Sequence, residues 1–206
     1  MKNKDNMKER GILFSGEMVR ALLSGTKTQT RRLVKVRPGY QIFDDDEQPW
    51  PLWTPRAAEL GGHDSEQPCP YGAVGDRLWV REAWRVSSFF DARPPRDIGA
   101  GTSCSYEATS PRAGTATGRY RHARFMPRWA SRITLELTDV RVQRLTTISE
   151  EDARAEGVEP MTRGPDACAA FGFTLAYARL WDVINGRGAW YANPWVWALT
   201  FKRVDA

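Results

Sequence analysis

Apolar and polar positions in the first part of the chain follow two periods, and these periods predict both strands and helices. An apolar run at residues 12–14 indicates a strand, and Ser15 is a candidate helix cap. Apolar side chains then recur at helical spacing until Gly25 ends the pattern, at Met18, Val19, Leu22 and Leu23. β-Branched residues favour a strand over 28–34, and alternation between apolar and larger polar side chains indicates another over 77–84.

The second part of the chain continues this mixture. Alternation over 132–145 changes parity after Asp139, which predicts one bent strand or a hairpin. Ser149 followed by three acidic residues is typical of a helix start, and a longer amphipathic helix is expected over 171–184. Four positions of that helix are expected to be buried: Leu175, Ala178, Trp181 and Ile184. A final strand begins near Trp195.

Two stretches lack any period, and we interpret them as long insertions at about 35–74 and 87–119, both rich in proline and glycine. Residues 1–10 are charged and are expected to form a disordered lead-in. The remainder, 11–206, is expected to be one domain. Scattered strands with few helices favour an α+β fold, a small mixed β-barrel flanked by short helices.

Composition narrows the function classes. Thirty Lys and Arg against 25 Asp and Glu give a net charge of +5, which permits a nucleic-acid partner without requiring one. Three widely spaced cysteines form neither a zinc motif nor a disulfide framework, so we expect no metal, no cofactor and a cytoplasmic location. The charged N-terminus does not resemble a signal peptide, and no apolar run reaches transmembrane length, so no membrane partner is expected. The oligomeric state is not indicated.

The densest candidate chemistry lies in residues 25–32, which hold a glycine, a lysine, three threonines and two arginines. Lys27 is a candidate base, Thr30 a hydroxyl nucleophile, and the forked guanidinium groups suit an anionic ligand. Candidate binding residues in this stretch are Gly25, Thr28, Arg31 and Arg32. The competing interpretation is a helix cap followed by a solvated basic strand.

Two further candidates lie outside this stretch. Glu82 shares a strand face with apolar residues, which indicates either pairing with an arginine near the core or a role in a site. Arginines interleave with aromatic residues over 119–132, a pattern that suits single-stranded nucleic acid but equally a surface strand; Arg124 and Arg128 are its candidate binding residues.

Taken together, these motifs resemble the ASCH family. The resemblance rests on Gly25-x-Lys27-x-x-x-x-Arg32, Gly75-Asp76, Ala155-Glu156-Gly157 and the closing aromatic strand, and it leaves out both insertions. The residues at 18–21, 27–32 and 75–82 are similar to those of phage and prophage members of the family. The resemblance implies a PUA-like β-barrel and an association with RNA, in a bacterial host or a phage-infected cell.

One position makes the resemblance more specific. Many ASCH proteins have glutamate three residues after the motif lysine, whereas this chain has Thr30, as do small bacterial amidohydrolases that deacylate N4-acetylcytidine. The resemblance therefore implies Lys27 as base, Thr30 as nucleophile and Glu156 as proton carrier or orienting group, with a nucleoside or RNA ligand. A non-catalytic RNA-binding module and a ribonuclease are the alternatives.

Overall fold

The computed structural model describes residues 7–35, 68–110, 118–161 and 172–204, together with the backbone of 41–42 and 52–53. These residues form two compact units. The first unit contains residues 1–28, 74–138 and 201–206, and the second contains 29–73 and 139–200. The described residues hold more strands than helices, and most of the strand pairings given are antiparallel, which confirms the α+β class.

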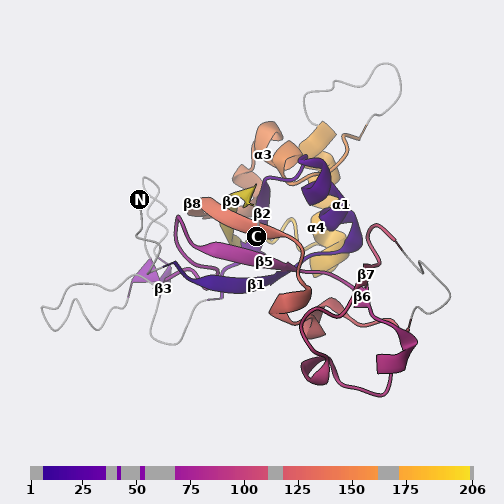
Figure 1. The fold of residues 1–206 in the computed structure, drawn as a ribbon. Coiled ribbons are helices and arrows are strands. Elements are labelled where there is room, and N and C mark those ends of the chain that lie inside the picture. Colours follow the sequence, from indigo (N-terminus) through magenta and orange to yellow (C-terminus); the bar gives the residue numbers. More distant parts are fainter. Residues whose placement is uncertain are drawn as a thin grey trace, which may run out of the picture. The chain divides into compact units, whose positions relative to one another are not determined.

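The first unit is built on strands β1 (Glu9–Leu13) and β5 (Arg77–Arg81), which pair in parallel and lie side by side in Figure 1. The opposite edge of β5 pairs antiparallel with the start of β8 (Thr134–Arg144). Helix α1 (Gly16–Ser24) follows β1, and it buries Val19 and Leu22 as its apolar spacing predicts. Because β1 begins at Glu9, ordered structure starts inside the range expected for the lead-in; residues 1–6 lie outside the described residues.

The segment expected to be an irregular insertion at 87–119 contains a few short elements. In its described residues this segment holds strand β7 (Ser105–Tyr106), paired with β6 (Trp84–Arg85), and two short 3-10 helices at Ser88–Phe90 and Pro95–Asp97. Ile98 is buried in a small core of its own, with Trp84, Val86, Met126 and Ala130. Isolated apolar residues form this core, so no sequence period announces it.

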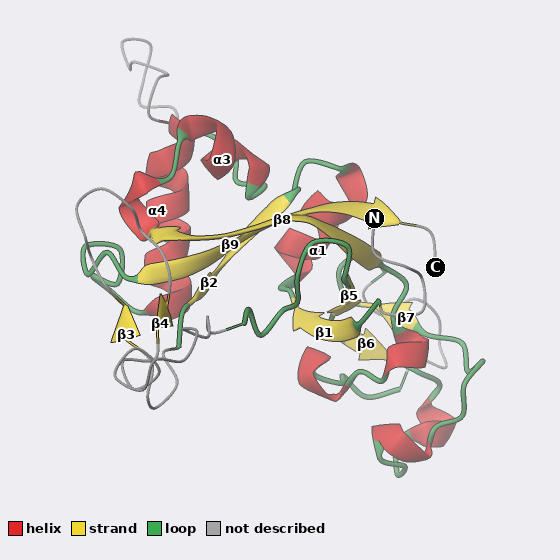
Figure 2. Ribbon diagram, turned by 90° about the vertical axis from the view of Figure 1, so that its left-hand side faces the viewer, coloured by secondary structure: helices red, strands yellow, loops and turns green. Residues whose placement is uncertain are grey.

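The second unit contains strand β2 (Gln29–Leu33), which pairs antiparallel with β9 (Trp195–Val204). Helices α3 (Glu150–Ala155) and α4 (Gly172–Asn185) pack against each other, as Figure 2 shows. Two short strands, β3 (Gln41–Ile42) and β4 (Leu52–Trp53), pair within the stretch expected to be the first insertion; most of that stretch lies outside the described residues.

The core of the second unit is aromatic, and it corrects the expected face of α4. Tyr177 and Trp181 are buried there with Leu145, Ile148, Ala153 and Val196. By contrast, Leu175 is 38% exposed and Ile184 is 54% exposed, although the spacing predicted both to be buried. The helix is rotated so that two aromatic rings four residues apart, rather than the aliphatic residues, face the core.

Strands β8 and β9 run through both units, so the strand order is β1-β5-β8-β9 in the first and β8-β9-β2 in the second. Of the two alternatives expected over 132–145, one bent strand or a hairpin, the structure has a single strand, β8. Among the described residues no pairing closes these strands into a barrel, so the expected barrel is observed as a mixed sheet with flanking helices.

Candidate functional site

The glycine before the motif lysine ends α1 as its sequence predicts. Gly25 has a φ of 80°, in the left-handed region, and its N–H donates to the Leu22 carbonyl at 3.2 Å. Lys27 follows, and its backbone N–H donates to the Ala21 carbonyl at 3.0 Å. The Lys27 side chain is only 2% exposed, and its Nζ lies 5.6 Å from the centroid of the Phe14 ring. Both residues belong to the first unit, as does the exposed Thr28.

The boundary between the units falls after Thr28, and the rest of the motif forms β2 in the second unit. Side chains alternate along a strand, so Arg31 shares one face with Gln29, while Thr30 shares the other with Arg32. Thr30 is 2% exposed and Arg31 is 3% exposed, so both faces of β2 are covered. The interpretation of this stretch as a solvated basic strand is therefore wrong, although the helix cap that precedes it is present.

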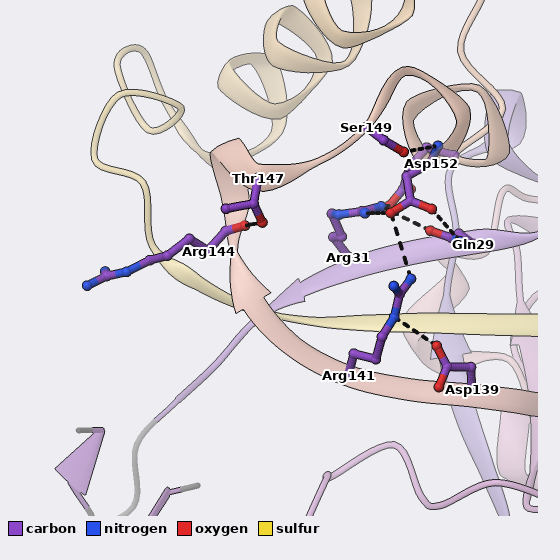
Figure 3. A network of polar contacts seen from close by, with 9 residues as sticks. Gln29, Arg31, Asp139, Arg141, Arg144, Thr147, Ser149 and Asp152 are labelled. Carbon is purple, nitrogen blue, oxygen red and sulfur yellow. Dashed lines mark hydrogen bonds and ion pairs between the residues drawn. The ribbon is translucent and has the colours of Figure 1, made fainter. Parts of the chain in front are cut away.

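Arg31 is the centre of a network of polar contacts that Figure 3 shows from close by. Its Nη2 lies 2.8 Å from Asp152 Oδ2, and its Nη1 lies 3.2 Å from Glu156 Oε1. The side chain of Gln29 completes the group: its Nε2 donates to Asp152 Oδ1 at 2.8 Å, and its Oε1 accepts from Arg31 Nη1 at 3.3 Å. We call these four residues, Gln29, Arg31, Asp152 and Glu156, the Arg31 cluster.

A second arginine extends the cluster toward solvent. Arg141, on β8, lies with Nη2 3.7 Å from Asp152 Oδ2 and with Nε 2.8 Å from Asp139 Oδ2. Ser149 caps α3 by accepting from the Asp152 N–H at 3.0 Å, which fixes the start of the helix that carries both acids of the cluster. The helix start predicted from Ser149 and the acidic residues is thereby confirmed.

Glu156 lies at the C-terminal end of α3 and is 3% exposed. Burial raises the pKa of the Tyr177 phenol well above its ordinary value, and the negative charge of Glu156 together with a hydrogen bond to Glu156 raises it further. Tyr177 thus remains a protonated donor to Glu156. The guanidinium Cζ of Arg31 lies 6.0 Å from the Tyr177 ring centroid, so the aromatic ring covers the cation of the cluster.

This arrangement holds a carboxylate rigidly in a buried position between a guanidinium and a phenol. Such a group can orient a ligand or a neighbouring amine, and it can accept a proton from one. Arg31 Nε is also buried and makes no hydrogen bond among the described residues, so the cluster retains one donor for a ligand.

The structure places Glu82 in the first unit, where it is 1% exposed. Arg132 binds it with both ends of the guanidinium fork, Nε to Oε1 at 2.8 Å and Nη2 to Oε2 at 3.0 Å. The same guanidinium lies 4.0 Å from the centroid of the Tyr106 ring. The pairing with an arginine expected for Glu82 is therefore observed, and its role in ligand binding stays a prediction.

The remaining candidate residues differ in how far they are engaged. Arg128 forms an ion pair with Glu9 at 2.9 Å, whereas Arg124 is exposed beside the Phe125 ring. Arg32 is half-buried. Burial raises the pKa of the Tyr71 phenol, and the nearby charge of Arg32 offsets part of that rise.

Asp152 and Tyr177 are the functional candidates that sequence reasoning missed. Asp152 was interpreted only as an acidic residue in the first turn of a helix, which it also is. Tyr177 lies four residues before Trp181, and this aromatic pair is the one signal in the sequence that predicts the buried face of α4.

No group of three or more His, Cys, Asp and Glu side chains in the described part of the chain is arranged to hold a metal ion. None of the helices described there has the length and apolar character that crossing a membrane requires.

Comparison with protein-family models and with curated proteins finds no match for this chain. Among solved structures, it is similar to a DUF984 protein from Enterococcus faecalis V583, with 12% identity and a TM-score of 0.39. It is also similar to an ASCH domain from Lactobacillus crispatus JV V101, with 11% identity and a TM-score of 0.37. Each match covers 97% of this chain and 81% of the other. The second structure comes from the family that the motifs of this chain resemble.

Proposed function

We propose that this chain is an ASCH-type protein that binds a nucleoside or an RNA base and hydrolyses the amide of N4-acylated cytosine. One observation carries the proposal: the three polar residues of the implied catalytic set are all buried. Lys27 is 2% exposed, Thr30 is 2% exposed and Glu156 is 3% exposed. Polar side chains are rarely buried to this degree without a structural or functional use, and buried titratable groups are typical of reactive sites.

The reaction is written in two halves. Thr30 Oγ attacks the acyl carbonyl while Lys27, in its neutral form, takes the hydroxyl proton. The C–N bond then breaks, the N4 amine leaves with that proton, and the acyl group remains as an ester on Thr30. Water hydrolyses the ester and releases a carboxylic acid. Of the two roles expected for Glu156, proton carrier or orienting group, the second fits its contact with Arg31, which lies on the face of β2 opposite Thr30. The contacts from Arg31 and Tyr177 keep Glu156 in place.

The tetrahedral intermediate needs hydrogen-bond donors for its oxyanion. The backbone N–H groups of Gly25 and Lys27 already donate to carbonyls of α1, so they are engaged in the helix end. We therefore assign the oxyanion to the guanidinium of Arg32.

The test is an assay of the conversion of N4-acetylcytidine to cytidine, in which chromatography measures the product. Lys27→Ala is expected to lower kcat about 10²–10⁴-fold, the usual contribution of a general base. Thr30→Val preserves side-chain shape but removes the nucleophile, so it should reduce turnover to background, and Glu156→Gln should slow it. Matched controls are Lys202→Ala, Thr146→Val and Glu159→Gln, which change exposed residues of the same types.

Thermal unfolding of each variant separates loss of chemistry from loss of fold. Full activity in Lys27→Ala, or wild-type turnover in Thr30→Val, would overturn the mechanism. A wild-type protein that binds cytidine derivatives but never releases product would leave the binding module as the function. Cleavage of RNA without added metal would instead identify the ribonuclease.

A further inference from the structure

The positive charge of the chain is concentrated in one segment of the first unit. Residues 85–132 contain nine arginines, no lysine and three acidic residues, a net charge of +6. The whole chain carries +5, so the remainder is slightly acidic. Several of these arginines are used internally: Arg85 pairs with Glu107, Arg128 with Glu9 and Arg132 with Glu82. In contrast, Arg93, Arg119 and Arg124 are exposed and form no ion pair with any described residue.

Large aromatic rings are exposed on the same segment. Phe89 is 74% exposed, Phe125 is 58% exposed and Tyr120 is 52% exposed. Each ring has an arginine beside it: Arg93 Cζ lies 5.7 Å from the Phe89 centroid, and Arg124 Cζ lies 6.0 Å from the Phe125 centroid. Arg85 Cζ is 5.7 Å from the Tyr120 centroid. Three large exposed rings on one short, arginine-rich segment are a candidate surface for a partner.

The backbone beneath these side chains is held by a buried arginine. Arg121 is 4% exposed and donates to the carbonyls of Phe90 at 2.6 Å and Arg93 at 3.1 Å. The Arg119 N–H donates to Asp91 Oδ1 at 2.8 Å, and the Gly118 N–H donates to the Val86 carbonyl at 2.8 Å. Segments 85–93 and 118–125 are thus tied together, and the exposed rings stand on a fixed framework that loses little entropy on binding.

We propose that these residues form a surface that binds single-stranded nucleic acid. We call it the aromatic–arginine patch and define it as Phe89, Arg93, Arg119, Tyr120, Arg124 and Phe125. The arginines neutralise phosphates, and the rings stack on bases that a single strand leaves open. A duplex keeps its bases stacked on one another, so it would use only the charges. An acidic protein would likewise have no use for three stacking surfaces.

The patch goes beyond the proposed hydrolysis. Half of its residues lie in the insertion at about 87–119 that the ASCH resemblance leaves out, and it shares no residue with Lys27, Thr30 or Glu156. Binding to the patch therefore stands or fails independently of amide hydrolysis.

The test is fluorescence anisotropy with a labelled oligouridylate of about 12 nucleotides, within the range that single-strand sites span. Phe89→Ala/Phe125→Ala is expected to raise Kd at least about 5-fold for each ring, because base stacking contributes that much per base. The control Tyr191→Ala removes a ring that is 86% exposed in the second unit and should leave Kd unchanged. Thermal unfolding confirms that the variants are folded.

A second pair of variants tests the charges. Arg93→Gln/Arg124→Gln is expected to make the log–log dependence of affinity on salt shallower by about 1.4, since each phosphate contact on a single strand contributes about 0.7. Arg187→Gln, which changes an exposed arginine of the second unit, should leave the slope unchanged. Wild-type Kd in the ring variant, equal weakening in Tyr191→Ala, or equal affinity for a duplex would overturn the proposal. Hydrolysis of free N4-acetylcytidine should be unaffected in the ring variant, so each proposal fails by a different readout.

Discussion

Replacing Arg31 with methionine tests whether the Arg31 cluster stabilises the second unit. Methionine preserves the length of the side chain and removes all five donors. The side chain of Arg31 is fully buried, that of Glu156 is 2% exposed, and that of Asp152 is 21% exposed. The substitution therefore leaves two carboxylates of the same sign on one helix, one of them deeply buried, and removes the donor to Gln29 Oε1.

The expected cost follows from these exposures. Breaking a buried ion pair by removing one partner costs about 3–5 kcal/mol, because the remaining charge stays buried without its cationic partner. Tyr177 still donates to Glu156, which places the expected cost toward the lower end of that range. Solvent screens Asp152, so most of the cost comes from Glu156. Glu156→Gln removes the ion pair with Arg31 but leaves an amide that can still form hydrogen bonds, so it should lower the free energy of unfolding by about 1–3 kcal/mol. The double variant no longer strands the Glu156 charge, so it should be less destabilised than the sum of the single variants by about 1–3 kcal/mol.

Urea unfolding followed by tryptophan fluorescence measures these costs, and Trp181 and Trp190 report on the core of the second unit. With a denaturant dependence of about 2 kcal/mol per molar, the unfolding midpoint of Arg31→Met should fall by about 2 M. Arg154→Met, on the same helix but exposed, is the control and should change stability by no more than about 0.5 kcal/mol. Strict additivity in the double variant, or a cost below about 1 kcal/mol for Arg31→Met, would refute the reasoning.

Two further predictions concern the first unit. Burial raises the pKa of the Cys104 thiol to about 11, and only the thiolate reacts with iodoacetamide. Alkylation of Cys104 at pH 8, followed by peptide mass spectrometry, should be much slower than that of a model thiol and should rise about tenfold per pH unit toward pH 11; a fast reaction at pH 8 would contradict the burial. A methyl group at Gly118 would lie 2.8 Å from the Val86 carbonyl oxygen. Gly118→Ala should therefore lower the free energy of unfolding by about 1–3 kcal/mol and weaken oligouridylate binding. The control in thermal unfolding is Gly99→Ala, because no atom lies within 4 Å of a methyl group at Gly99.

The elements that could be predicted are those specified by neighbouring residues. The helix over 16–24 has its start and stop written in Ser15 and Gly25, and the short acidic helix begins at Ser149. In these cases a side-chain cap or a positive φ decides the boundary, and both are local properties. The change in β8 is likewise visible in the sequence, because the apolar residues shift to the other alternate positions after Asp139.

What could not be predicted depends on residues far apart in the sequence. Arg31 meets Asp152 across 121 residues and Glu156 across 125. Asp152 does not differ in the sequence from an ordinary surface acid, and Glu156 stands out only through the family resemblance. The small core around Trp84 draws on single apolar residues from three segments, so the segment over 87–119 looks irregular until it is folded. On α4, the spacing allows either an aliphatic face or an aromatic face to be buried. The aromatic face, with Tyr177 and Trp181, is the buried one, because large rings bury more apolar surface.

The two faces of β2 separate the residues of the motif into two groups. A threonine and an arginine that are adjacent in sequence point to opposite sides of one strand, and both are buried. Arg31 is satisfied by Asp152 and Glu156, which is sufficient to explain its burial by stability alone. Thr30 has no comparable ionic partner, and a solvent-exposed strand would not need to bury its hydroxyl. Evidence for chemistry therefore rests on Thr30→Val more than on any change in the Arg31 cluster. A variant of Arg31 can lose activity merely by displacing α3, whereas valine at position 30 keeps the branched shape of threonine and replaces only its hydroxyl by a methyl group.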